Sequence, residues 1–274
     1  MVTFYQTHTS DFLCRASGPQ SRLQVAAHLH RHIELVLFLE GSAVAYDGTQ
    51  AYQLSPGDVF VSFPNHVHRF ESSGPERYIL MIVNPDLIPE LSHTFLGFSP
   101  RSALLPGAAR DGQLMQIAES LLMEADADSA LATQVRRGYL QVLFAKLLSQ
   151  MELQESPYQD SQALKSVISY CADHYQNELS LALLERELHI SKYYISHLFS
   201  DKLHIGFNNY VNSLRISYAC DALRHNTASV TEIAAQVGFG TPRTFNRAFL
   251  KQMGCTPSEY RRGKRPSGEP TVGK

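Results

Sequence analysis

The feature that most restricts the fold is an internal repeat in the C-terminal part of the chain. At an offset of 50 residues, Ile195, Phe199, Phe207 and Tyr210 match Phe245, Phe249, Pro257 and Tyr260. Upstream of these positions the offset becomes 49, and Leu181, Leu184 and Leu188 match Val230, Ile233 and Val237. The sequence therefore predicts two copies of one helical unit.

Each copy predicts two helices joined by a short turn. The apolar residues of Leu181–Leu188 and of Val230–Val237 recur at helical intervals. A break of about three or four residues follows, and then Ser191 or Thr241 stands where the N-cap of a second helix is expected. This order is the helix-turn-helix plan, in which the second helix can enter the major groove of DNA.

The second copy provides candidate DNA-reading residues. Gly238 permits the turn, and Phe245 and Phe249, four positions apart, are expected to face the core. The positions left to point outward are Arg243, Thr244, Asn246 and Arg247. Arginine and asparagine side chains can form paired hydrogen bonds with guanine and adenine edges, so this helix is predicted to read bases.

The same copy resembles the signature of AraC/XylS-type bacterial transcription regulators. The pattern I-A-x-x-x-G-F, followed by F-x-R-x-F-x-K-x-x-G-x-T-P-x-x-Y-R, is met at Ile233, Ala234, Gly238, Phe239, Phe245, Arg247, Phe249, Lys251, Gly254, Thr256, Pro257, Tyr260 and Arg261. The resemblance covers about the last hundred residues and includes both copies. It implies a regulator that binds double-stranded promoter DNA, contacts RNA polymerase and most commonly activates transcription.

The first copy and the connector complete the predicted DNA-binding domain. Lys192, Tyr193, Ser196 and His197 are outward positions of the first reading helix, and the last three occupy base-reading positions by resemblance. The alternative is that they are solvated residues of a helix face. By resemblance, residues 212–224 form one long helix joining the units, which would hold the two reading helices about 34 Å apart, one turn of DNA.

The distribution of charge agrees with two domains of different function. The formal net charge of −2 by itself argues against nucleic-acid binding. However, residues 1–159 contain 10 basic and 16 acidic residues, a net charge of −6, and residues 160–274 contain 14 basic and 10 acidic residues, a net charge of +4. The change coincides with the best linker candidate, around Pro157. We therefore predict an effector-binding and dimerisation domain over 1–154, a linker over 155–161, a DNA-binding domain over 162–263 and a disordered tail over 264–274.

The N-terminal half predicts an α+β domain. Short apolar or alternating runs from Val25 to Val83, separated by turn residues such as Pro56-Gly57-Asp58, predict a small antiparallel barrel or sandwich. The pattern then becomes helical over Asp111–Ala127 and Ser129–Gln154. By resemblance these two flanking helices form the dimer surface, whereas their apolar stripes could equally be buried against the strands. The predicted fold class is thus α+β with two domains, the second all-α.

A cluster of histidines marks the predicted strands. His28, His30 and Glu34 alternate onto one strand face, and His68 could complete a set of three histidines and one glutamate. The spacing resembles the first motif of cupin barrels, while the second motif departs from it at His66 and His68. Such a set suits zinc, iron, manganese or nickel.

The favoured prediction is a metal-free pocket for a small polar effector, such as a sugar. Its candidate residues are His28, His30, Glu34, Tyr46, His66 and His68. No cofactor is expected, and the alternative is a divalent metal on His28, His30, Glu34 and His68, which would make the chain a metal sensor or a metal-dependent cupin enzyme attached to a DNA-binding module.

The remaining composition agrees with a cytoplasmic regulator. The apolar runs are far shorter than the about 18 residues needed to cross a bilayer, and the N-terminal residues lack the form of a signal peptide. The four cysteines lack C-x-x-C spacing and predict reduced thiols. We therefore expect a homodimeric, non-enzymatic transcription regulator without a membrane partner.

Overall fold

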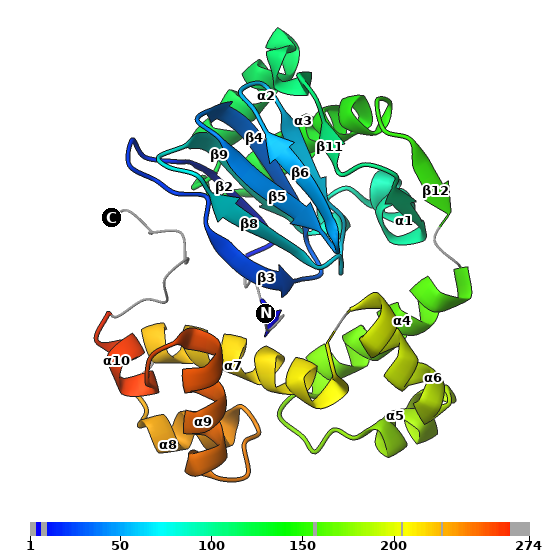
Figure 1. The fold of residues 1–274 in the computed structure, drawn as a ribbon, viewed down its shortest axis with the longest axis vertical. Coiled ribbons are helices and arrows are strands. Elements are labelled where there is room, and N and C mark those ends of the chain that lie inside the picture. Colours follow the sequence, from blue (N-terminus) through cyan, green and yellow to red (C-terminus); the bar gives the residue numbers. More distant parts are fainter. Residues whose placement is uncertain (1–3, 7–9, 156–157, 204, 226, 264–274) are drawn as a thin grey trace. The chain divides into compact units, whose positions relative to one another are not determined.

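A computed structural model of the 274-residue chain describes all residues except 1–3, 7–9, 156–157, 204, 226 and 264–274. Contacts divide the chain into two compact units (Figure 1). One consists mainly of residues 30–156 and the other mainly of residues 157–263. The fold class predicted from the sequence, a two-domain α+β chain with an all-α C-terminal part, is confirmed.

The strands of the N-terminal half form two five-stranded sheets. The first sheet has the order β1 (Phe4–Tyr5), β3 (Val25–Leu29), β8 (His68–Ser72), β5 (Ala43–Asp47), β6 (Gln50–Leu54). The second has the order β11 (Leu104–Leu105), β7 (Val59–Ser62), β4 (Ile33–Glu40), β9 (Arg77–Val83), β2 (Phe12–Ala16). A separate antiparallel pair consists of β10 (Phe98–Pro100) and β12 (Leu153–Glu155).

Side-chain alternation along β4 explains how the layers pack. Val36 and Phe38 are buried with residues of the first sheet, including Phe70. Leu35 and Leu37 point to the other face of β4 and are buried with the helices of this unit. The two sheets therefore pack face to face with helices outside the second one, and the described strands do not join into a single closed barrel.

The flanking helices begin where capping residues permit. Asp111 accepts a hydrogen bond from the Gln113 backbone N–H at the start of α2 (Gly112–Met123). Ser129 accepts one from the Ala132 N–H at the start of α3 (Ala130–Leu148). Both predicted helices are confirmed, but α3 ends at Leu148, and part of the remaining predicted helix is the strand β12. The sequence interpretation missed α1 (Pro89–Gly97) and two short 3₁₀ segments, η1 (Pro85–Leu87) and η2 (Ala108–Arg110).

The boundary between the units is short. The strand β12 extends to Glu155, and α4 (Tyr158–His174) begins three residues later. The described part of the predicted linker 155–161 therefore belongs to these two elements. The predicted disordered tail, 264–274, lies outside the described residues.

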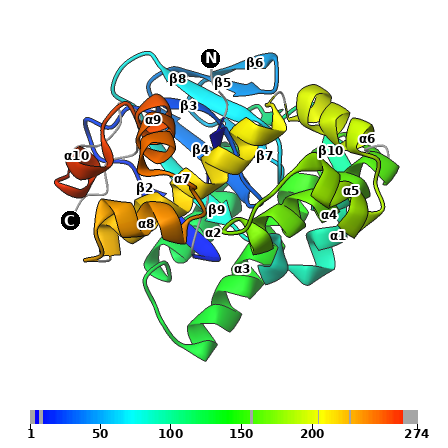
Figure 2. The ribbon, with the colours of Figure 1, turned by 90° about the horizontal axis from the view of Figure 1, so that it is seen from below.

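The C-terminal unit contains the predicted repeat. Its first copy has α5 (Leu181–Leu188), α6 (Lys192–His197) and a π-helical turn, η3 (Leu198–Lys202). Its second copy has α8 (Val230–Gln236), α9 (Pro242–Met253) and α10 (Pro257–Arg261). The long helix α7 (Phe207–His225) joins them, with α4–α6 at one end and α8–α10 at the other (Figure 2).

The repeated apolar residues form the cores of the two copies. Ile195, Phe199 and Tyr210 are fully buried in the first, as are Phe245, Phe249 and Tyr260 in the second. Among the described helices, none is both long and apolar enough to cross a membrane.

Candidate functional site

Each helix-turn-helix turn contains a residue in the left-handed region. Gly238 has a φ of +88°, and a Cβ atom there would lie 2.6 Å from the carbonyl oxygen of Gln176. His189, the matching residue of the first copy, has a φ of 54°. Glycine adopts this conformation without a steric cost, whereas histidine does not.

The second helix of each copy begins at the predicted N-cap. The Ser191 hydroxyl accepts a hydrogen bond from the Tyr194 N–H. The Thr241 hydroxyl accepts one from the Thr244 N–H. These caps define where α6 and α9 start, and they determine which side chains follow on the outer faces.

All eight side chains predicted to contact DNA are exposed. On α6 they are Lys192, Tyr193, Ser196 and His197, and on α9 they are Arg243, Thr244, Asn246 and Arg247. Tyr193 is 73% exposed, which is unusual for a large aromatic side chain. Thr244 also donates a hydrogen bond to the Thr241 carbonyl, so its hydroxyl is partly engaged in the cap. The two helices thus present polar and basic faces suited to a DNA groove.

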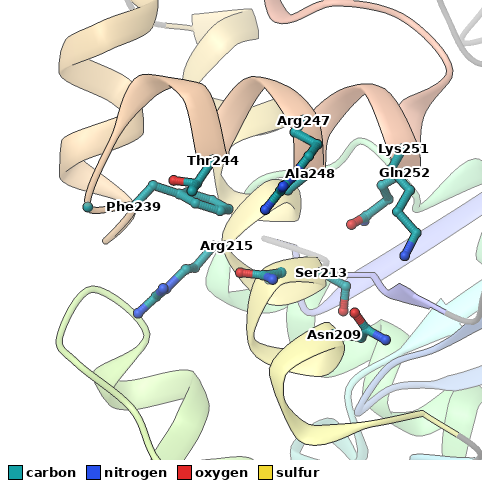
Figure 3. Close-up of a pocket in the computed structure, with 11 residues that line it drawn as sticks. Asn209, Ser213, Arg215, Phe239, Thr244, Arg247, Ala248, Lys251 and Gln252 are labelled. Carbon is teal, nitrogen blue, oxygen red and sulfur yellow. The ribbon is translucent and has the colours of Figure 1, made fainter.

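A groove of about 520 Å³ separates α9 from α7 (Figure 3). The described residues that line it are Asn209, Asn212, Ser213, Arg215, Phe239, Gly240, Thr244, Arg247, Ala248, Lys251 and Gln252. Of these eleven residues three are basic and none is acidic. The sequence interpretation used Lys251 only as part of the family pattern and missed it as a candidate contact, although its position four residues after Arg247 was a usable signal.

The sensor candidates form a buried cluster in the N-terminal half. His28, His30, Glu34 and His68 each offer one ligand atom, and these atoms lie within 4.8 Å of one another. Glu34 Oε2 is 3.0 Å from His30 Nε2 and 3.3 Å from His68 Nε2. The side chains of these three residues are at most 5% exposed. The structure therefore brings together the four residues of the predicted metal set.

The contacts of the three histidines restrict which tautomers their rings adopt. The Nδ1 atoms of His28 and His30 lie 2.9 and 3.0 Å from the carbonyl oxygens of Ala26 and His32. His68 Nδ1 lies 3.0 Å from the His66 carbonyl oxygen. A carbonyl oxygen only accepts, so a hydrogen on Nδ1 suits each of these contacts, whereas the Ser62 hydroxyl, 3.0 Å from His68 Nδ1, can donate to that atom instead.

The buried Glu34 carboxylate favours a positive charge beside it. The Nε2 atoms of His30 and His68 face the Glu34 carboxylate, and each contact is favourable when Nε2 carries a hydrogen or when a cation lies between the two groups. Burial lowers the pKa of His30, and His68 adds to this effect, against the attraction of Glu34. Burial also opposes charge on His68, but Glu34 outweighs it and raises the pKa of His68. The site can thus hold a proton on His68 or a metal cation among the four ligands.

The side chains of the other two effector candidates pair with groups outside this cluster. Tyr46 donates a hydrogen bond to Glu71, and the Arg69 guanidinium stacks on its ring 3.4 Å from the centroid. These side chains lie on the face of the first sheet opposite Ala45 and Phe70, so the structure does not bring Tyr46 together with the histidines. His66 is half-buried and pairs with Asp47 at 3.2 Å.

Two helix-turn-helix units with exposed polar helices, together with a sheet-rich unit, define a DNA-binding transcription regulator with a separate sensor domain. Comparisons with known proteins specify the family. Residues 13–166 match the AraC-like ligand binding domain, and residues 184–263 match a helix-turn-helix domain. The chain belongs to the AraC family of transcription regulators.

Full-length relatives agree with this assignment. The chain is 25% identical to the transcriptional activator RhaS of Salmonella arizonae over 94% of this chain and 97% of the relative. It is 24% identical to the uncharacterized regulator YfiF of Bacillus subtilis, over 85% and 78%. The fold is similar to that of fatty-acid-bound ToxT from Vibrio cholerae, with a TM-score of 0.63 and 18% identity over 93% of this chain and 96% of that one.

Proposed function

We propose that the chain is a homodimeric transcription activator whose sensor domain binds a small polar effector, such as a sugar or a related metabolite. The observation that carries this proposal is the duplicated helix-turn-helix unit with its two exposed reading helices in one AraC-family chain. Effector control requires that the effector bind one arrangement of the protein better than another, typically by about 1–3 kcal/mol. A regulator that acts on promoter DNA together with RNA polymerase works in the cytoplasm, and this function needs no catalytic activity.

Arg243 provides the direct test of DNA reading. It is exposed in the first turn of α9 and can pair with a guanine edge. Arg243→Ala should lose about 1–3 kcal/mol of specific affinity in a gel-shift titration on the cognate promoter. Arg101→Ala is the matched control, because Arg101 is exposed in the other unit and pairs with Glu152. An unchanged affinity of the Arg243 variant would contradict the assignment of α9 as a reading helix.

The buried polar cluster supports a polar effector. His30, Glu34 and His68 supply buried donors and acceptors that bond to one another, and a polar effector can exchange hydrogen bonds with them, whereas a large apolar ligand cannot. A thermal-shift and calorimetry screen should therefore find sugars or related polar metabolites among the binders. Since one structure of ToxT holds an unsaturated fatty acid, fatty acids belong in the same screen. Binding of fatty or aromatic compounds alone would contradict the proposal.

An exposed stripe on α3 supports dimerisation. Leu131, Val135, Gly138, Val142 and Ala145 are all exposed and recur at alternating intervals of four and three residues. Leu131 is 79% exposed and Val142 is 50% exposed. This spacing matches the contact line of two helices packed as a coiled coil. Val142→Glu should convert the dimer to a monomer in sedimentation experiments without lowering its melting temperature, whereas Gln141→Glu should leave the dimer intact.

Metal sensing is a second candidate function, favoured by the orientation of the histidines. Each of the three Nδ1 atoms lies beside a backbone carbonyl, which favours a hydrogen on Nδ1 and a lone pair on Nε2 that can bind a metal. Together with Glu34 they provide a nitrogen-rich set suited to zinc, nickel or iron. The resident metal would then supply the positive charge that the buried Glu34 carboxylate favours.

The metal proposal is tested on untagged protein after dialysis against EDTA. Metal sensing predicts uptake of about one Zn²⁺ or Ni²⁺ per chain, a higher melting temperature and an altered affinity for promoter DNA. Glu34→Gln should weaken all three effects, whereas Glu119→Gln, at an exposed position on α2, should not. If elemental analysis finds no metal and added ions change neither melting nor DNA affinity, the metal-free effector site stands.

A further inference from the structure

The groove between α7 and α9 has the charge of an anion site. Arg247 and Lys251 project from α9 toward α7, where Asn209 and Ser213 lie opposite them (Figure 3). Neither cation forms an ion pair with a carboxylate in the described part of the chain. Arg215 is already engaged, because its guanidinium donates to the carbonyls of Tyr175 and Asn177 at 2.8 and 2.7 Å. Two cations and nearby side-chain amides therefore face an open groove without a neutralising acid.

The position of the groove on α9 separates two sets of side chains. Arg243 and Asn246, in the first half of the helix, are exposed but do not line the groove. Arg247 and Lys251, four residues apart on another face of the helix, line it together with Thr244. The buried Phe245 and Phe249 fix this rotation of α9, because they anchor its opposite side in the core. The helix therefore carries one outward polar face and one cationic flank.

The geometry of DNA distinguishes these two faces. The major groove is about 12 Å wide and is bordered by a phosphate backbone on each side. A helix lying in it meets base edges mainly with its N-terminal residues, and its flanks lie beside the backbones. With α9 in the groove, Arg243 and Asn246 face bases, and the flank beside α7 faces one backbone.

We propose that the groove between α7 and α9 binds a phosphate of the DNA backbone. Arg247 and Lys251 supply the positive charges, and the amides of Asn209 and Asn212 on α7 supply further donors. Arg247 is then a positioning residue for the duplex, and base reading by the second copy is assigned to Arg243 and Asn246. The inference rests on the proposed DNA binding and adds a specific backbone contact to it.

The test uses the full-length protein and two duplexes. One is a duplex that the wild type selects from a random pool, and the other is a scrambled duplex of the same composition. Fluorescence anisotropy at several KCl concentrations gives the affinity for each duplex and the slope of log Kd against log salt concentration. Each neutralised phosphate contributes about 0.9 to that slope.

Loss of a phosphate contact weakens the binding of the protein to both duplexes by the same factor. Lys251→Ala and Arg247→Ala should each reduce affinity about three- to tenfold for both duplexes at low salt and lower the slope, and removing both cations together should lower it by about 0.9, the value for one phosphate. Asn209→Asp, which introduces a negative charge, should weaken binding more than Asn209→Ala does. Arg243→Ala should mainly reduce the preference for the selected duplex, and Arg101→Ala should change neither quantity. Melting curves check that each variant is folded.

Three results would overturn the inference. The first is an unchanged salt slope in both the Lys251 and Arg247 variants. The second is a loss confined to the selected duplex, which would make Arg247 a base reader. The third is stabilisation of the wild type, but not of Lys251→Ala, by inorganic phosphate with unaltered DNA affinity, which would indicate a site for a free anion. A wild type that selects no duplex would instead contradict the proposed function itself.

Discussion

The two helix-turn-helix copies reach the same turn with different residues. In the second copy Gly238 occupies the left-handed position, and the backbone of Gln176 leaves no room for a Cβ atom there. In the first copy His189 occupies the matching position. Glycine adopts the left-handed conformation of the second turn without strain. In the first turn the same conformation costs a histidine about 1–2 kcal/mol, which the packing around it must offset. Thus two repeats can have the same backbone conformation at a turn although only one of them has the residue that adopts it without strain.

The copies also differ in their reading helices. In the second, α9 runs for 12 residues, from Pro242 to Met253, and ends at Gly254 in the left-handed conformation. In the first, α6 has 6 residues, from Lys192 to His197, and continues into the π-helical turn η3. Such turns are less favourable than α-helix and often occur at functional sites. We therefore expect the first copy to be the less stable and more adaptable reader.

The largest expected difference concerns the turn glycine. Gly238→Ala should destabilise the second copy by more than about 2 kcal/mol, because a strained φ and a clash with the Gln176 carbonyl add together. Hydrogen exchange of the amides of α8 and α9 measures this effect locally. Gly240→Ala is the matched control, since a Cβ atom there meets nothing within 4 Å. Unchanged protection of the α8 and α9 amides from exchange in the Gly238 variant would contradict the predicted difference between the two turns.

The N-caps of the first helices should show a smaller difference. Ser229 and Glu232 form a reciprocal capping box at α8, whereas the structure gives α5 a single cap bond from the Leu183 N–H to Ser180. Ser229→Ala and Ser180→Ala should each cost about 0.5–2 kcal/mol, with the greater loss at Ser229. Hydrogen exchange of the amides of each copy at increasing denaturant concentrations measures the two losses of stability. A greater loss for the Ser180 variant would contradict the predicted order.

The smallest effect is expected from repairing the first turn. His189→Gly removes the left-handed penalty, but glycine loses more conformational entropy on folding, so the net gain should be no more than about 1 kcal/mol. Slower amide exchange in α5 and α6 would confirm it. Faster exchange would mean that the His189 side chain stabilises the first copy in a way that outweighs its backbone cost.

Local patterns explain why much of the fold could be predicted. The four-residue spacing of Phe245 and Phe249 and the caps Ser191 and Thr241 depend on residues within one or two helical turns, and the structure contains both repeated units. The helix α1 was not predicted because it begins at Pro89 with no side-chain cap bond. The end of α3 was misjudged because β12 pairs with a strand about fifty residues earlier, which helical periodicity does not report.

Local sequence patterns predicted the candidate sites only in part. Alternation placed His28, His30 and Glu34 together because they lie close in sequence. Alternation also places Tyr46 on the opposite face from Ala45, but the sequence could not show which face would meet the histidines. The contact of His68 with Glu34 joins different sheets, so it depends on their packing.

The sequence by itself determined the duplicated helical unit, its caps and turns, the charged reading helices and the spacing of the histidines. These features follow from periodicity and from hydrogen bonds between near neighbours in the chain. The tertiary structure alone decided that the Nε2 atoms of His30 and His68 meet the Glu34 carboxylate and that Arg247 and Lys251 face α7 across a groove. Both arrangements join segments far apart in sequence, and only packing of the buried side chains fixes their relative rotation.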